Sequence, residues 1–215
     1  DSVKACAERF LSEPDRPLHV LINNAGLAGA TGLTRQGFEL TFGVNHLGHF
    51  LLTELLLDRM KRSTPARIVN VASMAHYKSP ALDLEALQTS ASKHQVMTRY
   101  RVSKLCNVLH AKELASRLEG SGVTTYSVHP GVVASDVWRN VPRPLAWLAK
   151  PFMITNEQGA ATTLYCAASP ACSDQSGLYY DEEQDKTASA QARDPELAER
   201  LHARSEAWVR AWLPA

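Results

Sequence analysis

The stretch RIVNVAS, residues 67–73, is a short and mostly apolar run that decides the fold together with two similar runs. LHVLIN (residues 18–23) comes before it, and VTTYSVH (residues 123–129) comes after it. Short apolar runs bounded by turn residues are typical of strands that are buried on both faces, as in parallel sheets. The three runs therefore predict three strands of a parallel sheet.

Long helical patterns separate these strands. Apolar residues recur at helical spacing from about Arg35 to Arg62, after Thr34 as the expected cap, and a second helix is predicted from about Val96 to Leu118. Parallel strands need such long crossovers, and right-handed connection is the strong default. The sequence therefore predicts an α/β fold, a doubly wound parallel sheet with helices on both faces.

The last third of the sequence adds two helices and one strand to this pattern. Thr155 and Gln158 form a capping box for a helix that runs to about Ala168. GLYYD (residues 177–181) predicts a short strand, and Asp194-Pro195 predicts the start of a final helix. No repeat or low-complexity linker divides the chain, so residues 1–215 are interpreted as one domain.

Composition and charge argue against several classes of function. The 23 basic and 22 acidic residues give a formal net charge of +1 without a long run of either sign, so no nucleic-acid partner is expected. The four cysteines are scattered without zinc spacing and are interpreted as reduced thiols. His46 and His49 lack a third ligand nearby, so helix packing or hydrogen bonding is predicted and no metal site.

Tyr100 and Lys104, in the stretch YRVSK, are the residues most suited to chemistry. Residues four apart lie on the same side of a helix, so the phenol and the ammonium can point into one pocket. Ser73 follows a strand, and ligands of open α/β sheets bind at the carboxyl ends of the strands. A nearby cation favours the phenolate, so Lys104 is expected to lower the pKa of Tyr100 and prepare it for proton transfer. Taken alone, the pair also fits an exposed helix surface.

Together with several other motifs, these residues resemble the short-chain dehydrogenase/reductase family. The resemblance covers nearly the whole chain and rests on Asn23-Asn24-Ala25-Gly26, Asn45, Ser73, Tyr100-x-x-x-Lys104 and Pro130-Gly131. Within the family, the contexts LINNAG, FGVNHLGHFLLT and GVTTYSVHPGVV resemble the retinol dehydrogenase branch. The resemblance implies a Rossmann-like fold and an oxidoreductase that interconverts an alcohol and an aldehyde or ketone.

The same resemblance implies a role for each site residue. Tyr100 would be the general acid/base, and Lys104 would bind the nicotinamide ribose. Ser73 would position the carbonyl, and Asn45 would complete the tetrad and anchor a water that relays protons to the lysine. The expected cofactor is NADP(H) in preference to NAD(H). Its other contacts are expected on the adenosine and ribose side at Asn23, Ala25 and Gly26, and on the nicotinamide side at Pro130, Gly131 and Val133.

The segment from Val137 to Ile154 is predicted to cover the substrate, because this region sets specificity in the family. Its apolar side chains suit a retinoid or another apolar alcohol or aldehyde: Trp138, Leu145, Trp147, Leu148, Phe152 and Met153. The same segment also fits a membrane-surface contact. The C-terminal stripe of Leu197, Leu201, Trp208 and Trp212 is predicted to pack in the core, and its two tryptophans also fit a homodimer interface. An intracellular protein is expected, associated with the endoplasmic reticulum membrane if it carries the family's N-terminal anchor and cytoplasmic otherwise.

The glycine-rich GxxxGxG turn, which wraps the cofactor pyrophosphate in this family, does not occur in the 215 residues. The sequence is therefore interpreted as an N-terminally truncated domain that lacks the family's first βαβ unit. For residues 1–215 alone we expect weak or absent catalysis and some aggregation, because loss of a central strand leaves an open sheet edge. The alternative is a non-catalytic Rossmann-like remnant that acts as an interaction or dimerisation module.

Overall fold

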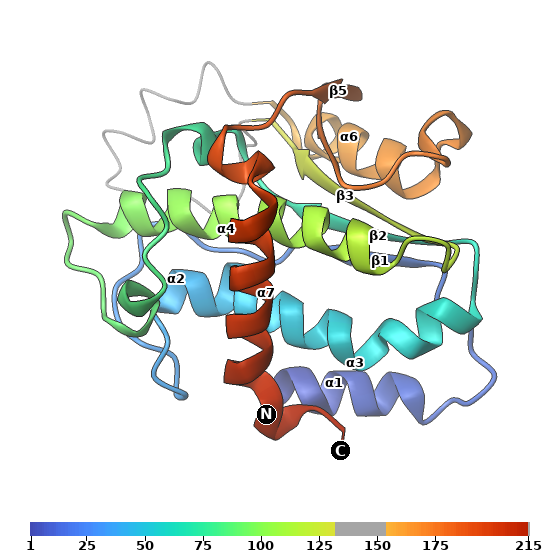
Figure 1. Ribbon diagram of the computed structural model, residues 1–215, viewed down its shortest axis with the longest axis horizontal. Coiled ribbons are helices and arrows are strands. Elements are labelled where there is room, and N and C mark those ends of the chain that lie inside the picture. The colour runs from blue at the N-terminus through green and yellow to red at the C-terminus, as the bar shows by residue number, and fades with distance from the viewer. Residues whose placement is uncertain (132–153, 215) are drawn as a thin grey trace.

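The computed structural model describes residues 1–131 and 154–214, which form a five-stranded sheet in the order β1-β2-β3-β4-β5 (Figure 1). The first four strands are parallel and the fifth is antiparallel to the fourth: β1 (Val20–Asn23), β2 (Ala66–Val71), β3 (Val123–His129), β4 (Leu178–Asp181) and β5 (Gln184–Lys186). The predicted α/β fold with a mainly parallel sheet is confirmed.

Helices lie on both faces of this sheet (Figure 1). One face carries α1 (Ser2–Leu11), α2 (Leu40–Phe42), α3 (Gly48–Arg62), α4 (Val96–Arg117) and, packed on α4, α7 (Pro195–Val209). On the opposite face, the described residues place α6 (Asn156–Ala168). The connections contain the short 3-10 helices η2 (Met74–Lys78), η3 (Glu85–Gln88), η6 (Pro170–Cys172), η7 (Gln191–Arg193) and η8 (Arg210–Trp212).

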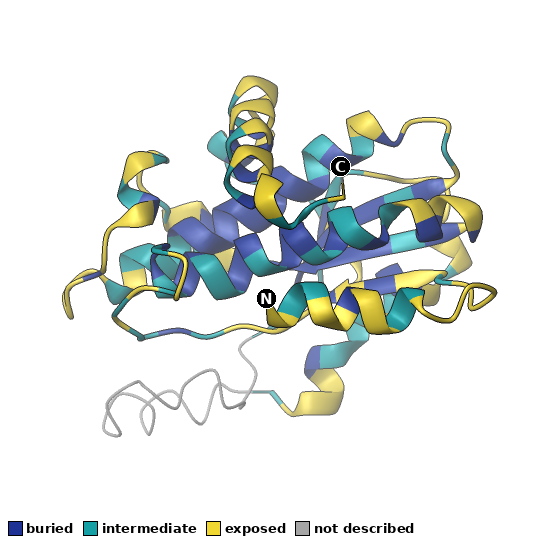
Figure 2. Ribbon diagram, turned by 90° about the horizontal axis from the view of Figure 1, so that it is seen from below, coloured by how far each residue is buried: buried dark blue, intermediate teal, exposed yellow. Residues whose placement is uncertain are grey.

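The core lies on β2, on β3 and along α4, and Figure 2 shows the buried residues gathered in the middle of the sheet and its helices. On β2, Ile68 packs with the α1 and α3 side, whereas Val69 packs with Tyr126 and Cys166 on the α6 side. Alternate residues of a strand point to opposite faces, so a strand covered on both sides is apolar throughout. The prediction that RIVNVAS and VTTYSVH are buried on both faces is therefore confirmed.

Strand β1 differs from its prediction in length and burial. It begins at Val20 and alternates, so that Leu21 and Asn23 are buried while the side chains of Val20 and Ile22 are 38% and 37% exposed. Ile22 is level with Val69 and so faces the α6 side, but α6 packs mainly on β2 and β3. The second edge of β1 pairs with no strand among the described residues. Among the described residues, one face of β1 is thus left partly exposed.

The first long helix begins later than predicted and is interrupted. Gly37 has φ = +86°, which a right-handed helix does not allow, and the Thr34 hydroxyl accepts a hydrogen bond from the Phe38 N–H in the turn before the helix. Glu39 is the actual cap, because its carboxylate accepts from the Phe42 N–H at 2.7 Å. A π-helical turn, η1 (Gly43–Leu47), then separates α2 from α3. Such turns are frequent at functional sites.

Several other local predictions are confirmed, and one element is new. The Thr155–Gln158 capping box starts α6, and Asp194 caps α7 by accepting from the N–H groups of Glu196 and Leu197. Strand β5 was not predicted. The turn between β4 and β5 has Glu182 and Glu183 at positive φ. Such a turn is usually recognised in a sequence by asparagine or glycine, so the two glutamates gave no sign of a hairpin.

Glu54 of α3 provides the first testable prediction. Burial and the nearby Glu206 of α7 raise the pKa of its carboxyl from 4.5 to about 7. A carboxyl with a raised pKa supports folding fully below pH 4.5 and loses that contribution as the pH rises towards 7. We expect Glu54→Gln to stabilise the protein at pH 8 by about 2 kcal/mol, a value discounted for partial exposure. The gain should shrink as the pH is lowered.

Urea unfolding at pH 8 and at lower pH measures this effect. Glu199→Gln is the matched control, because Glu199 is an exposed glutamate on α7. Equal effects of the two substitutions at pH 8 would show that ionisation of Glu54 does not destabilise the folded protein.

Candidate active site

Ser73 and Tyr100 bring the end of β2 against the first turns of α4. Ser73 follows the strand and caps η2, its hydroxyl accepting from the Ala75 N–H at 3.1 Å. Ser73 is 9% exposed, and its side chain lies close enough to the Tyr100 side chain to lower the pKa of that phenol. The serine and the phenol, predicted separately from a strand end and from a helix, therefore meet in the structure.

Lys104 lies one helical turn after Tyr100, as its spacing predicts. Its Nζ is 5.6 Å from the centre of the Tyr100 ring and donates to the main-chain oxygen of Val71 at 2.8 Å. The side chain is buried, and burial lowers the pKa of its ammonium to about 8. A buried ammonium has three N–H donors, and Val71 uses one of them.

The structure does not show the expected lowering of the Tyr100 pKa. Burial raises the pKa of the phenol, and the nearby Ser73 hydroxyl opposes this rise. Lys104 lies over the ring and donates its hydrogen bond to Val71. Helical spacing predicts the proximity of the two side chains, but the burial that controls the pKa comes from the tertiary packing.

Asn45 lies in the π-helical turn η1 and joins the loop after β1 to α4. Its Nδ2 donates to the Leu27 carbonyl at 3.0 Å and to the Ser103 hydroxyl at 3.0 Å, and its Oδ1 accepts from the Leu27 N–H at 2.9 Å. The Asn45 carbonyl accepts from His49 Nδ1 at 2.9 Å. The side chain thus fixes the loop beside the residue that precedes Lys104, and its place in a proton relay stays a prediction.

The residues expected on the adenosine side of the cofactor fall into two groups. Asn23 points into the protein, where its Nδ2 donates to Thr53 at 3.0 Å and to Asn70 at 2.9 Å, so its side chain supports the sheet. Ala25 and Gly26 are exposed in the loop after β1. A Cβ on Gly26 would lie 3.4 Å from the Asn45 amide oxygen, so this loop packs closely on η1.

The residues expected on the nicotinamide side follow β3. Pro130 and Gly131 are half-buried there, and Gly131 has φ = +84°, which favours glycine at this position. Val133 and the predicted substrate segment up to residue 153 lie outside the described residues, and so does its predicted membrane-surface contact. His129, the last residue of β3, is buried near Asp181, and burial lowers the pKa of its imidazole.

Tyr77 is a second tyrosine close to Ser73 in the sequence. Its hydroxyl donates to the Thr187 carbonyl at 2.7 Å, and its side chain is 45% exposed. No hydrogen bond joins it to Ser73 in the described structure. Ser73 lowers the pKa of the Tyr100 phenol and does not act on that of Tyr77, so Tyr100 is the phenol that lies beside Ser73.

Sequence reasoning missed two members of the site. The Val71 main-chain oxygen accepts from Lys104, and it also accepts from Asn107 Nδ2 at 3.1 Å. Asn107 is three residues after Lys104, so helical spacing places it on the same side of α4. That spacing is the only signal that the sequence contains for Asn107.

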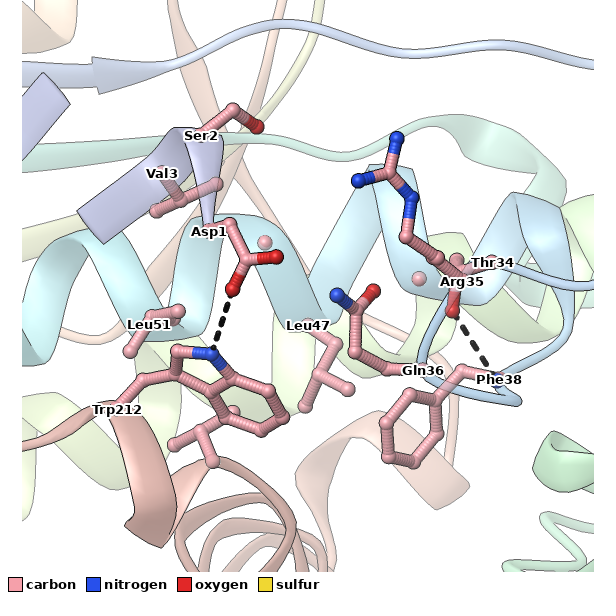
Figure 3. Close-up of a pocket in the computed structure, with 13 residues that line it drawn as sticks. Asp1, Ser2, Val3, Thr34, Arg35, Gln36, Phe38, Leu47, Leu51 and Trp212 are labelled. Atoms are coloured by element: carbon pink, nitrogen blue, oxygen red, sulfur yellow. Dashed lines mark hydrogen bonds between the residues drawn. The ribbon is translucent and has the colours of Figure 1, made fainter. Parts of the chain in front are cut away.

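A separate cavity of about 320 Å³ lies where α1, α3 and the C-terminal segment meet (Figure 3). Figure 3 shows the Trp212 indole facing Asp1, to which its Nε1 donates at 3.2 Å. Leu47 and Leu51 supply part of its apolar wall. None of the four predicted catalytic residues lines this cavity.

In the part of the chain that the structure describes, no helix is both long and apolar enough to cross a membrane.

The fold and the site define a class of protein with a mainly parallel α/β sheet, in which a serine after β2 lies beside a tyrosine and a buried lysine of α4. The chain belongs to the short chain dehydrogenase family, whose model matches residues 1–145. Retinol dehydrogenase 12 of Homo sapiens is 48% identical over 205 residues, which cover 93% of this chain and 63% of that protein. Retinol dehydrogenase 11 of Homo sapiens is 46% identical over 203 residues, with the same coverage.

These relatives confirm the predicted retinol dehydrogenase-like branch, and the chain spans 63% of the length of each. A solved structure agrees with this placement. The crystal structure of an uncharacterized protein from Mycobacterium Paratuberculosis superimposes with a TM-score of 0.72 at 31% identity, covering 96% of this chain and 72% of that one. The predicted family and the Rossmann-like fold are therefore confirmed.

Proposed function

We propose that the protein containing this chain is an NADP(H)-dependent oxidoreductase that interconverts an alcohol and an aldehyde or ketone. The observation that carries this proposal is the contact of Ser73, Tyr100 and Lys104, with the lysine nitrogen 5.6 Å from the phenol ring. The retinol dehydrogenases at 46% and 48% identity support a retinoid or another apolar carbonyl compound as the substrate.

In this proposal the side chains hold the substrate oxygen and move its proton. When bound, the nicotinamide supplies or accepts the hydride. The Ser73 hydroxyl holds the carbonyl oxygen beside the Tyr100 hydroxyl, whose pKa it lowers. The phenol donates its proton to that oxygen in reduction and accepts it in oxidation. The Lys104 ammonium stabilises the phenolate that remains after the donation.

The residues around Lys104 fit the nicotinamide half of a dinucleotide. Val71 uses one of the three lysine donors, so two remain for ribose hydroxyls. Gly131 would lie beside the nicotinamide carboxamide, as the family resemblance implies. The choice of NADP(H) over NAD(H) rests on the retinol dehydrogenase branch alone.

Two exposed methionines support an apolar substrate. Met74 follows Ser73 directly and is 51% exposed, and Met97 precedes Tyr100 by three residues on the same helix face and is 36% exposed. Methionine side chains are flexible and polarizable and adapt to apolar ligands. These side chains would contact the part of the substrate next to the carbonyl.

Titration of residues 1–215 with NADPH, followed by the nucleotide fluorescence, tests the proposal directly. We expect saturable binding of NADPH, and NADH is titrated as the comparison. Lys104→Met should weaken the binding of NADPH, because it removes the buried ammonium, whereas Lys112→Met on the same helix should leave it unchanged. A folded chain that binds neither nucleotide would contradict cofactor binding by these 215 residues. Added retinaldehyde then tests turnover.

A non-catalytic interaction module is the second candidate function. The observation that favours it is the partly exposed face of β1, where Val20 and Ile22 lie, together with an edge of β1 that pairs with no strand among the described residues. An open strand edge with apolar side chains pairs readily with another chain. A folded chain that binds no nucleotide but sediments as a dimer would favour this candidate. A monomer under the same conditions would argue against it.

A further inference from the structure

A line of buried hydrogen bonds runs from α7 to the main-chain oxygen that holds Lys104. Ser205 Oγ on α7 lies 3.3 Å from His46 Nε2 in η1, and His46 Nδ1 lies 3.3 Å from Asn107 Oδ1 on α4. Asn107 Nδ2 donates to the Val71 oxygen at 3.1 Å, and Lys104 Nζ donates to the same oxygen at 2.8 Å. The five residues come from four segments far apart in the sequence.

The chemistry of the acceptors fixes the direction of every bond in this line. A main-chain oxygen can only accept, so Asn107 must present its amide nitrogen to Val71 and its oxygen to His46. His46 must then donate through Nδ1, and its neutral ring accepts from the Ser205 hydroxyl at Nε2. Burial lowers the pKa of His46 to about 3, which keeps the ring neutral near pH 7.

We propose that His46 and Asn107 are positioning residues for Lys104. Val71 has two lone pairs on its carbonyl oxygen, and Asn107 occupies one while Lys104 occupies the other. His46 and Val71 together prevent the Asn107 amide from turning over, since a turned amide would place its NH2 group against the Nδ1–H of His46 and its oxygen against the Val71 oxygen. A role of the held Lys104 in a reaction rests on the proposed function. The line of hydrogen bonds itself does not depend on that function.

The proposal explains how the Lys104 ammonium is kept away from water. Asn107 is 3% exposed and fills the space beside the shared oxygen. Replacing it with alanine would leave a polar space next to Val71 and Lys104, and such a space takes up water. Water beside the ammonium would reverse part of the desolvation that lowers the pKa of Lys104.

The tautomer of His46 tests the line without any substitution. Long-range proton–nitrogen NMR spectra of the histidine-labelled chain near pH 7.5 report which ring nitrogen carries the proton. We expect a neutral His46 with a protonated Nδ1 and an unprotonated Nε2. A His46 protonated at Nε2 alone would overturn the proposal, because its Nδ1 could then no longer hold the Asn107 oxygen.

The titration of Lys104 tests the positioning itself. The carbon-13 signal of its ε-carbon, assigned with Lys104→Met, gives the titration midpoint in the unmodified chain and in Asn107→Ala. We expect Asn107→Ala to raise the midpoint by about one pH unit, because water reaches the ammonium. Thr125→Val is the control, since it removes a different buried hydrogen bond to α4, from the Thr125 hydroxyl to the Ala111 carbonyl. It should leave the midpoint unchanged.

An unchanged Lys104 midpoint in a folded Asn107→Ala chain, or the same rise in the Thr125→Val control, would overturn the proposal. If Asn107→Ala does not fold, the tautomer of His46 in the unmodified chain still tests the proposal: a protonated Nδ1 supports it, and protonation at Nε2 alone overturns it. Neither NMR measurement needs a bound nucleotide. A failure of nucleotide binding therefore contradicts the proposed function, whereas a failure of these spectra contradicts the positioning role.

Discussion

Acidification to about pH 5 is expected to unfold the protein, because buried imidazoles must then take up protons that the folded state excludes. His46 of η1, His110 of α4 and His202 of α7 pack together with Phe50 of α3. The ring centres of His46 and His110 are 5.6 Å apart, and those of His110 and His202 are 6.3 Å apart. In the described structure, neither nitrogen of His110 has a hydrogen-bond partner.

Burial is the main cause of the expected sensitivity to acid. It lowers the pKa of His46 to about 3 and that of His202 to about 4, and it also lowers the pKa of His110 well below 6.5. The imidazoles lower one another's pKa, and Arg117 acts in the same direction on His202. His49, which donates to Asn45 and faces Lys104, is lowered to about 4.

The sign of the effect follows from the lowered pKa values. A histidine whose folded pKa lies below the unfolded value of 6.5 gives its full stability above pH 6.5 and loses it as the pH falls towards 4. At pH 5 each such group costs about 2 kcal/mol relative to pH 7.5. Three of them cost about 6 kcal/mol, which approaches the whole stability of a typical domain.

Thermal and urea unfolding followed by circular dichroism between pH 7.5 and pH 4.5 measure this loss. His110→Leu should reduce the dependence on pH, because it removes one acid-sensitive ring whose nitrogens are unpaired in the described structure. His94→Gln, at an exposed position, should leave the dependence unchanged. A chain whose stability is the same at pH 7.5 and pH 5 would show that these rings are accessible to protons when folded.

Tyr100→Phe is expected to reduce turnover by at least about 100-fold, the lower end of what a positioned proton donor contributes. The substitution removes the hydroxyl that lies near Ser73 but keeps the aromatic ring beside Lys104. Nucleotide affinity should therefore stay nearly the same. Reduction of an apolar aldehyde, followed by the consumption of NADPH, measures the turnover of the protein that contains this chain.

Tyr77→Phe is the matched control for this substitution. It removes a phenol hydroxyl from the same region, but that hydroxyl donates to Thr187 and has no bond to Ser73 in the described structure. We expect its turnover to stay within about twofold of the unmodified protein, since no proton donor is lost. Retained turnover in Tyr100→Phe, or an equal loss in both variants, would remove Tyr100 from its proposed role.

The sequence by itself determined the elements and the neighbours that depend on local rules. Short apolar runs predicted β2 and β3, and capping residues predicted the starts of α6 and α7. The spacing of Tyr100 and Lys104 predicted that they share one side of α4. These features depend on residues within one element or on the general rule that ligands bind at strand ends, and both can be seen in a sequence.

Only the tertiary structure decided the features that depend on distant residues. The exposure of Ile22 depends on where α6 lies, and the pKa of Tyr100 depends on its burial. The line from Ser205 through His46 and Asn107 ends on a main-chain oxygen, which no sequence motif marks. The physical reason is that burial and hydrogen bonding act over a few ångströms, whereas the groups that meet here are up to 159 residues apart in the chain.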